Sequence, residues 1–83
     1  MGTITPGKRI YLNAEGHLVF AEQGCYGKDN DGQWWCRPPK GGAGVLSDHE
    51  VVEHADGTIT VSPSILMPGI FHGYLRAGVW EEV

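Results

Sequence analysis

Apolar and polar residues alternate along much of this chain, and the alternation predicts β-strands. It is clearest in Thr58-Ile59-Thr60-Val61-Ser62, where Ile59 and Val61 would face a core and the hydroxyl side chains would face outward. Pro63 follows at once and has no backbone donor, so we expect it to end this strand or to mark an edge strand. No apolar pattern of helical period runs longer than a turn or two. The pattern therefore predicts an all-β, or mostly β, fold.

Short loops that end in glycine separate the predicted strands. Residues 13–16, Asn-Ala-Glu-Gly, would join a strand at 9–12 to one at 17–21, and the same type of loop returns at 55–57 and 76–78. In each loop the glycine would take the positive φ that other residues resist. We therefore expect an antiparallel meander that forms a compact sandwich or a partial barrel.

Two further segments complete the predicted sheet. Residues 49–54 predict a strand with Val52 pointing inward, and residues 73–83 predict a closing hairpin in which Tyr74 and Trp80 pack. A chain of 83 residues indicates one domain, residues 1–83, with only a small core. Because so small a sheet has edge strands that need cover, a homodimer is plausible.

Charge and hydropathy exclude two classes of partner. Residues 1–41 carry five Lys/Arg against four Asp/Glu, whereas residues 42–83 carry one against six. Nucleic-acid binding needs a basic face, and none is visible. No apolar run approaches the roughly 20 residues of a membrane helix, and the N-terminus lacks the apolar stretch of a signal peptide. We therefore expect a cytoplasmic protein whose acidic half suits a basic protein surface.

The cysteines and histidines suggest a metal site and also argue against it. Cys25, Cys36, His49 and His54 run as C-x10-C-x12-H-x4-H, but the cysteines of a zinc finger lie two to four residues apart. The two histidines would also point to opposite faces of one strand. A disulfide between the cysteines would close a small loop, although a reducing cytoplasm opposes it. Two buried free thiols are the remaining alternative.

Other candidate chemistry is weaker. Residues 29–32, Asp-Asn-Asp-Gly, have a calcium-loop composition but lack the full ligand spacing, so we expect a polar turn. There is no G-x-S-x-G elbow, and a small β-meander offers little volume for a pocket. Catalysis is therefore not the favoured interpretation.

The adjacent pair Trp34-Trp35 predicts one buried and one exposed ring. Neighbours on a strand face opposite ways, so one indole could pack in the core while the other stays at the surface. An exposed tryptophan is a favoured anchor at protein interfaces, and the alternative is that it only covers the second face of a thin sheet.

The last third of the chain resembles a known family. Residues 56–65, which end in Ser-Pro-Ser-Ile, and residues 72–80, which begin His-Gly-Tyr-Leu, are similar to a small domain family of unknown function common in bacteriophages and prophages. The resemblance covers roughly residues 45–81. It implies a small phage-type β domain and leaves the activity open.

The resemblance also implies a zinc site in many family members. They carry a Cys-x-x-Cys near the start and a Cys or Trp just before the motif histidine, whereas here Phe71 precedes His72 and no Cys-x-x-Cys occurs. The site would then be lost, or rebuilt with Cys25, Cys36 and His72. Otherwise the His72 ring would hold the corner at the start of the hairpin by bonding to backbone.

We therefore expect a phage-type accessory protein that binds another protein, for example a host or defence protein in the host cytoplasm. A small zinc-binding domain and a virion structural component are the alternatives. The expected binding residues are Trp34, Trp35, His72, Tyr74 and Trp80.

Overall fold

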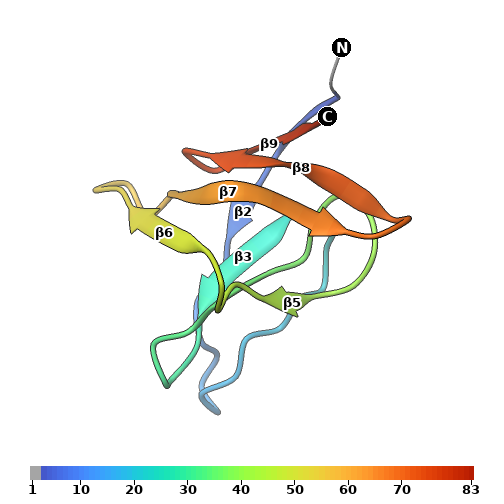
Figure 1. The fold of residues 1–83 in the computed structure, drawn as a ribbon. Coiled ribbons are helices and arrows are strands. Elements are labelled where there is room, and N and C mark those ends of the chain that lie inside the picture. Colours follow the sequence, from blue (N-terminus) through green and yellow to red (C-terminus); the bar gives the residue numbers. More distant parts are fainter. Residues whose placement is uncertain (1–2) are drawn as a thin grey trace.

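Residues 3–83 form two β-sheets and no helix in the computed structural model, which describes this part of the chain (Figure 1). The strands are β1 (Ile4–Pro6), β2 (Lys8–Arg9), β3 (Cys25–Lys28), β4 (Trp34–Cys36), β5 (Gly44–Val45), β6 (Glu50–Glu53), β7 (Ile59–Met67), β8 (Phe71–Arg76) and β9 (Val79–Glu82). The predicted all-β class is confirmed. The described residues contain no helix long and apolar enough to cross a membrane.

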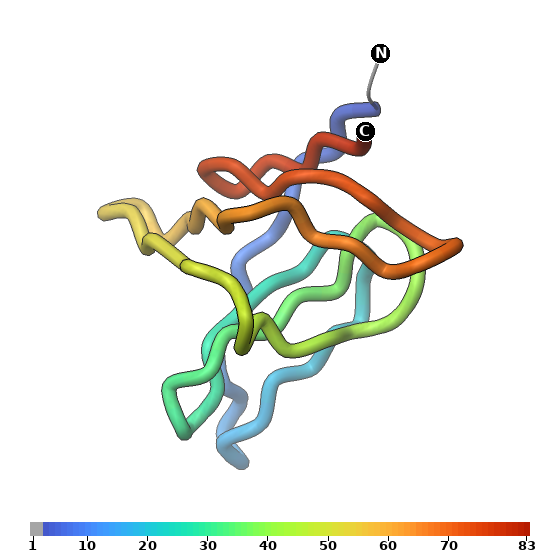
Figure 2. Tube along the Cα trace, viewed as in Figure 1, coloured from blue at the N-terminus to red at the C-terminus, as the bar shows by residue number. Residues whose placement is uncertain are grey.

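The five-stranded sheet is antiparallel throughout and has the order β1-β9-β8-β7-β6. Strands β6 to β9 follow one another as the predicted meander. The N-terminal strand β1 then adds to the far edge, where Thr5 pairs with Trp80. Segments from the two ends of the chain therefore lie side by side in one sheet (Figure 2).

The four-stranded sheet, in the order β2-β3-β4-β5, departs from the prediction in two ways. Strands β2 and β3 pair in parallel. Residues 17–21 form no strand; they belong to the segment between β2 and β3, which crosses the outer face of this sheet. A Cβ built on Gly27 of β3 would lie 2.9 Å from Leu18 Cδ2 and 2.7 Å from the carbonyl oxygen of Ile10. The segment packs on the sheet because glycine leaves room for it.

The core lies between the two sheets. Trp80 is fully buried, its ring meets Phe71 edge-on at 5.5 Å, and its Nε1–H donates to the carbonyl oxygen of Gly24 at 2.9 Å. The predicted inward positions Ile59 and Val61 are confirmed. The other buried members of the core are Tyr26, Cys36, Leu46, Ile65, Phe71 and Leu75.

One prediction for the strands is wrong and another holds in part. Strand β7 continues through Pro63, so the proline does not end it, but β6 pairs with β7 only as far as Ser62, so Pro63 lies where one side of β7 is an edge. Val52 points outward and is 49% exposed. Its neighbour Val51 pairs with the buried Val61 and packs against the core, because cross-strand partners share one face of a sheet.

The glycine-ended loops behave as predicted in their dihedral angles. Gly16, Gly57 and Gly78 have φ of 80°, 87° and 79°. The last loop differs from the other two because Ala77 is also left-handed, with φ of 46°. Two consecutive positive φ values give the tight two-residue turn that suits the twist of a hairpin.

Candidate binding groove beside Trp35

Trp34 and Trp35 on β4 point to opposite sides of the four-stranded sheet, as predicted. Trp34 packs against the core, and Trp35 pairs with Gly27 on β3, beneath the segment that crosses the outer face. Both side chains are half-buried, so the predicted difference between a buried and an exposed ring is not found. The two indoles therefore lie on the two opposite faces of one thin sheet.

The Trp34 side is occupied by cations of the chain itself. The guanidinium of Arg9 lies 4.9 Å from the Trp34 ring centroid and 4.4 Å from that of Tyr11. Arg9 Nη1 also donates to Glu53 Oε2 and to the carbonyl oxygen of Gly57, each at 2.8 Å. These contacts tie β2 to the five-stranded sheet, since Glu53 ends β6.

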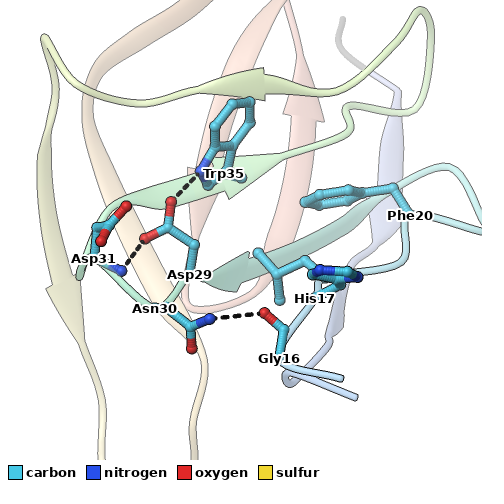
Figure 3. Close-up of a pocket in the computed structure, with 8 residues that line it drawn as sticks. Gly16, His17, Phe20, Asp29, Asn30, Asp31 and Trp35 are labelled. Carbon is cyan, nitrogen blue, oxygen red and sulfur yellow. Dashed lines mark hydrogen bonds between the residues drawn. The ribbon is translucent and has the colours of Figure 1, made fainter. Parts of the chain in front are cut away.

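The Trp35 side is an open groove of about 420 Å³ (Figure 3). Trp35, Phe20 and Leu18 supply its apolar lining, and Asp29 and Asp31 supply its carboxylates. Figure 3 shows the carboxylates of Asp29 and Asp31 on the left and the rings of Phe20 and His17 on the right, with Trp35 above them and bonded to Asp29. The arrangement combines flat apolar surface with negative charge.

Two turns of the same construction form the walls of the groove. The side chain of Asn13 accepts from the N–H groups of Glu15 and His17, at 3.0 and 2.9 Å. In the same way Asp29 Oδ1 accepts from the N–H groups two and four residues further on, at 2.8 and 2.9 Å. Each turn has a left-handed glycine at its fourth position, Gly16 or Gly32. The spacing Asn/Asp-x-x-Gly therefore builds both walls locally.

The two walls are held together across the groove. Asn30 Nδ2 donates to the carbonyl oxygen of Gly16 at 2.9 Å, so one turn is hydrogen-bonded to the other (Figure 3). In addition, Arg37 Nη1 donates to the carbonyl oxygen of Phe20 at 2.7 Å. These bonds fix the position of both loops before any ligand arrives.

Asp29 connects its wall to the aromatic floor. Its Oδ2 accepts from Trp35 Nε1–H at 2.8 Å. That bond, followed by the bonds from the backbone N–H groups of Gln33 and Asp31, lowers the pKa of Asp29 below its usual value. The groove therefore carries a fixed negative charge at neutral pH.

The residues predicted to bind zinc are not brought together. Cys36 pairs with Tyr26 and shares its inward face, whereas Cys25, next to Tyr26 on β3, points to the opposite face. His72 lies on the other sheet. Among residues 3–83 no group of three or more His, Cys, Asp or Glu side chains could hold a metal ion.

The two thiols are free and buried, and they are not bridged. Burial raises the pKa of the Cys36 thiol to about 12. The two histidines of the finger-like spacing are engaged separately: His49 Nε2 bonds to the carbonyl oxygen of Ser64 at 3.1 Å, and His54 Nε2 bonds to Thr60 Oγ1 at 2.7 Å.

The remaining predicted binding residues lie away from the groove. His72 is exposed on β8, and its Nε2 bonds to the hydroxyl of Ser64 at 3.0 Å, a side chain rather than the backbone partner we expected. Tyr74 is half-buried beneath the guanidinium of Arg76, 4.2 Å from its ring centroid. Trp80 is 0% exposed, so its ring is unavailable to a partner in this structure, because both sheets enclose it.

Sequence reasoning found only Trp35 among the groove residues. The sequence predicts a strand at residues 17–21, which include Leu18 and Phe20, and a polar turn without function at residues 29–32, which include Asp29 and Asp31. A signal was present, because residues 13–16 and 29–32 share the spacing Asn/Asp-x-x-Gly. What the spacing could not show is that the two turns lie side by side.

Comparison with known proteins adds no family to this description. No protein-family model matches the chain, and no curated protein or solved structure matches it significantly. The resemblance to the phage and prophage family therefore stays a prediction.

Proposed function

We propose that this protein is a phage-type accessory protein that binds another protein through the groove beside Trp35. One observation carries the proposal: a preformed groove of about 420 Å³ is lined by the half-buried rings of Trp35 and Phe20 and by the side chains of Asp29 and Asp31. Concave sites with an apolar lining and a few placed polar groups are the usual form of binding sites.

The construction of the groove supports recognition. Its walls are held by hydrogen bonds within each turn and by the bond from Asn30 to Gly16, so little ordering is needed on binding. A half-buried tryptophan such as Trp35 offers a large contact area with few rotatable bonds. These features favour a partner segment that inserts one side chain between the two turns.

The proposed partner is a host or defence protein in the host cytoplasm, a choice that rests on the small size, the acidic second half and the phage-type motif of the chain. A second copy of the chain is a less favoured partner at the β6 edge of the five-stranded sheet. Strand β6 begins and ends with Glu50 and Glu53, and an antiparallel copy of β6 would set these like charges opposite each other.

A randomised peptide display library tests the proposal without knowledge of the partner. The immobilised protein is expected to enrich a consensus peptide, whose affinity for wild type and variants is then measured. Phe20→Ala removes one ring of the apolar lining, and Val19→Ala is the matched control, since Val19 is 56% exposed in the same segment and does not line the groove.

We expect the enriched peptide to bind Phe20→Ala about tenfold or more weakly than wild type, and to bind Val19→Ala unchanged. The circular dichroism spectra of both variants check that each is folded. A selection that enriches no peptide, or a consensus peptide that binds Phe20→Ala as well as wild type, would overturn the proposal.

A further inference from the structure

The chain twice combines an arginine, an aromatic ring and a carboxylate into one group. Arg9 stacks on Trp34 at 4.9 Å and bonds to Glu53 at 2.8 Å. Arg76 stacks on Tyr74 at 4.2 Å, and its Nη1 bonds to Glu81 Oε1 at 2.7 Å. In each case the planar guanidinium contacts a ring with its face and a carboxylate with its edge.

The groove holds two of these three components, and neither a guanidinium nor an ammonium lines it; the imidazole of His17 lies among its lining side chains. Trp35 is the ring and Asp29 is the carboxylate, with Asp31 beside it on the same wall. Asp29 Oδ2 accepts from Trp35 Nε1–H alone, and a carboxylate oxygen has room for a second donor. The groove therefore holds the ring and the carboxylate of the Arg9 and Arg76 groups without a guanidinium, and here the carboxylate bonds directly to the indole N–H.

No cation of the described chain fills the place. The sequence has six Lys and Arg residues, and each is engaged elsewhere. Lys8 pairs with Glu22, Arg9 with Glu53, Lys40 with Glu82 and Arg76 with Glu81, while Lys28 lies over Trp34 and Arg37 donates to the carbonyl oxygens of Phe20 and Gly41. Within residues 3–83, no guanidinium or ammonium lies over the ring of Trp35.

We propose that the groove receives an arginine side chain of the partner protein, which stacks between Trp35 and Phe20 and bonds to the carboxylates of Asp29 and Asp31. This inference rests on the proposed function and names the chemistry that the same groove recognises. Arginine fits better than lysine because its guanidinium is flat, stacks on indole and offers paired donors to a carboxylate.

The probe is N-acetyl-arginine-N-methylamide, titrated into the full chain and followed by two-dimensional ¹H–¹⁵N NMR. Its neutral isostere, N-acetyl-citrulline-N-methylamide, has nearly the same shape without the charge. Each of the three tryptophans gives one indole N–H signal, which the corresponding Trp→Phe variant assigns. Trp34 and Trp80 then serve as internal controls.

We expect saturable shifts of the Trp35 indole N–H and of the amides of residues 29–33, with little change at Trp34 and Trp80. The citrulline isostere should bind about fivefold or more weakly, because it lacks the cation–π and charge-assisted contacts. Asp31→Asn should weaken arginine binding several-fold. Asp48→Asn, the same charge change at an exposed position outside the groove, should not.

Equal binding of the arginine and citrulline probes, or equal weakening by Asp31→Asn and Asp48→Asn, would overturn the arginine inference. Enriched library peptides that need Phe20 but contain no basic residue would also overturn it, and the proposed function would stand. If the arginine probe binds at Trp35 but the library enriches no peptide, the groove is a site for a guanidinium and the protein-binding function is overturned.

Discussion

The two faces of the four-stranded sheet differ in what covers them. The Trp34 face packs against the other sheet, and the chain's own Arg9 and Lys28 lie over the indole. The Trp35 face is crossed by the segment between β2 and β3, and the groove beside it is open. A smaller hollow of about 300 Å³ borders Trp34 and His49, and no carboxylate lines it.

The difference shows how one short strand can serve stability on one side and recognition on the other. Alternation along β4 sends adjacent indoles to opposite faces. Each ring meets a carboxylate, Glu53 through Arg9 on one side and Asp29 directly on the other. On the Trp34 side the third component is internal, and on the Trp35 side we infer that a partner supplies it.

The largest expected effect concerns the thiols, which lie on different faces. Burial raises the pKa of the Cys36 thiol from its usual 9.0 to about 12, which lowers the thiolate fraction about a thousandfold at a given pH. We therefore expect iodoacetamide at mildly alkaline pH to alkylate Cys36 in the folded protein at least about a thousandfold more slowly than in the unfolded chain. Timed quenching and peptide mass spectrometry measure both rates.

The same digest, run without reductant, checks the separation of the thiols. Cys25 and Cys36 point to opposite faces, so no peptide linked through these two residues should appear. Rapid alkylation of Cys36 in the folded protein would contradict its burial. A peptide linked through Cys25 and Cys36 would contradict their placement on opposite faces of the sheet.

The next effect compares the two indoles directly. Trp34→Ala should lower the free energy of unfolding by about 3 kcal/mol, since it removes core packing and the ring beneath Arg9. Trp35→Ala should cost only about 1 kcal/mol, because the groove side is open and one hydrogen bond to Asp29 is lost. Urea unfolding measures both values. Equal losses of stability would contradict the claim that Trp34 stabilises the fold more than Trp35 does.

A glycine on the groove face gives a more local test. Gly27→Ala would set a methyl group 2.7 Å from the carbonyl oxygen of Ile10 and should destabilise the protein by about 2 kcal/mol. Amide hydrogen exchange should quicken in residues 10–21 more than in β8. Gly42→Ala is the matched control, since a methyl group there meets nothing within 4 Å. The same loss in both variants would contradict the close packing of this segment.

The smallest effect is the pH dependence of the groove wall. The bond from Trp35, with those from the N–H groups of Gln33 and Asp31, lowers the pKa of Asp29 in the folded protein below its ordinary value of 3.8. The ionised carboxylate therefore stabilises the fold fully at any pH above that ordinary value. That contribution disappears as the pH falls through the folded pKa. The free energy of unfolding of the wild type should therefore fall more steeply below about pH 4 than that of Asp29→Asn. Urea unfolding at a series of pH values measures both, and the same pH dependence in the two proteins would count against the bond.

Much of the local structure was predictable, and the errors have a common origin. The left-handed glycines at positions 16, 57 and 78 follow from turn chemistry within a few residues. The strand predicted at 17–21 failed because that segment packs across a sheet face instead of pairing. Val52 was misjudged because register against β7 decides which side chain points inward.

The candidate site was predictable in one residue only. The pair Trp34-Trp35 indicated one inward and one outward ring, but nothing in the spacing assigned the sides. The trio Cys25, Cys36 and His72 looked like possible ligands because sequence separation says nothing about faces. In the fold the cysteines diverge across one sheet and His72 lies on the other.

The sequence by itself determined the all-β class, the positions of the glycine turns and the opposite orientation of the two indoles, because these depend on contacts within a few residues. The tertiary structure decided that Arg9 covers Trp34, that the turns at 13–17 and 29–33 meet through the bond from Asn30 to Gly16, and that the thiols are separated. Those outcomes depend on strand register and on close approach between segments far apart in the chain, which no local pattern encodes.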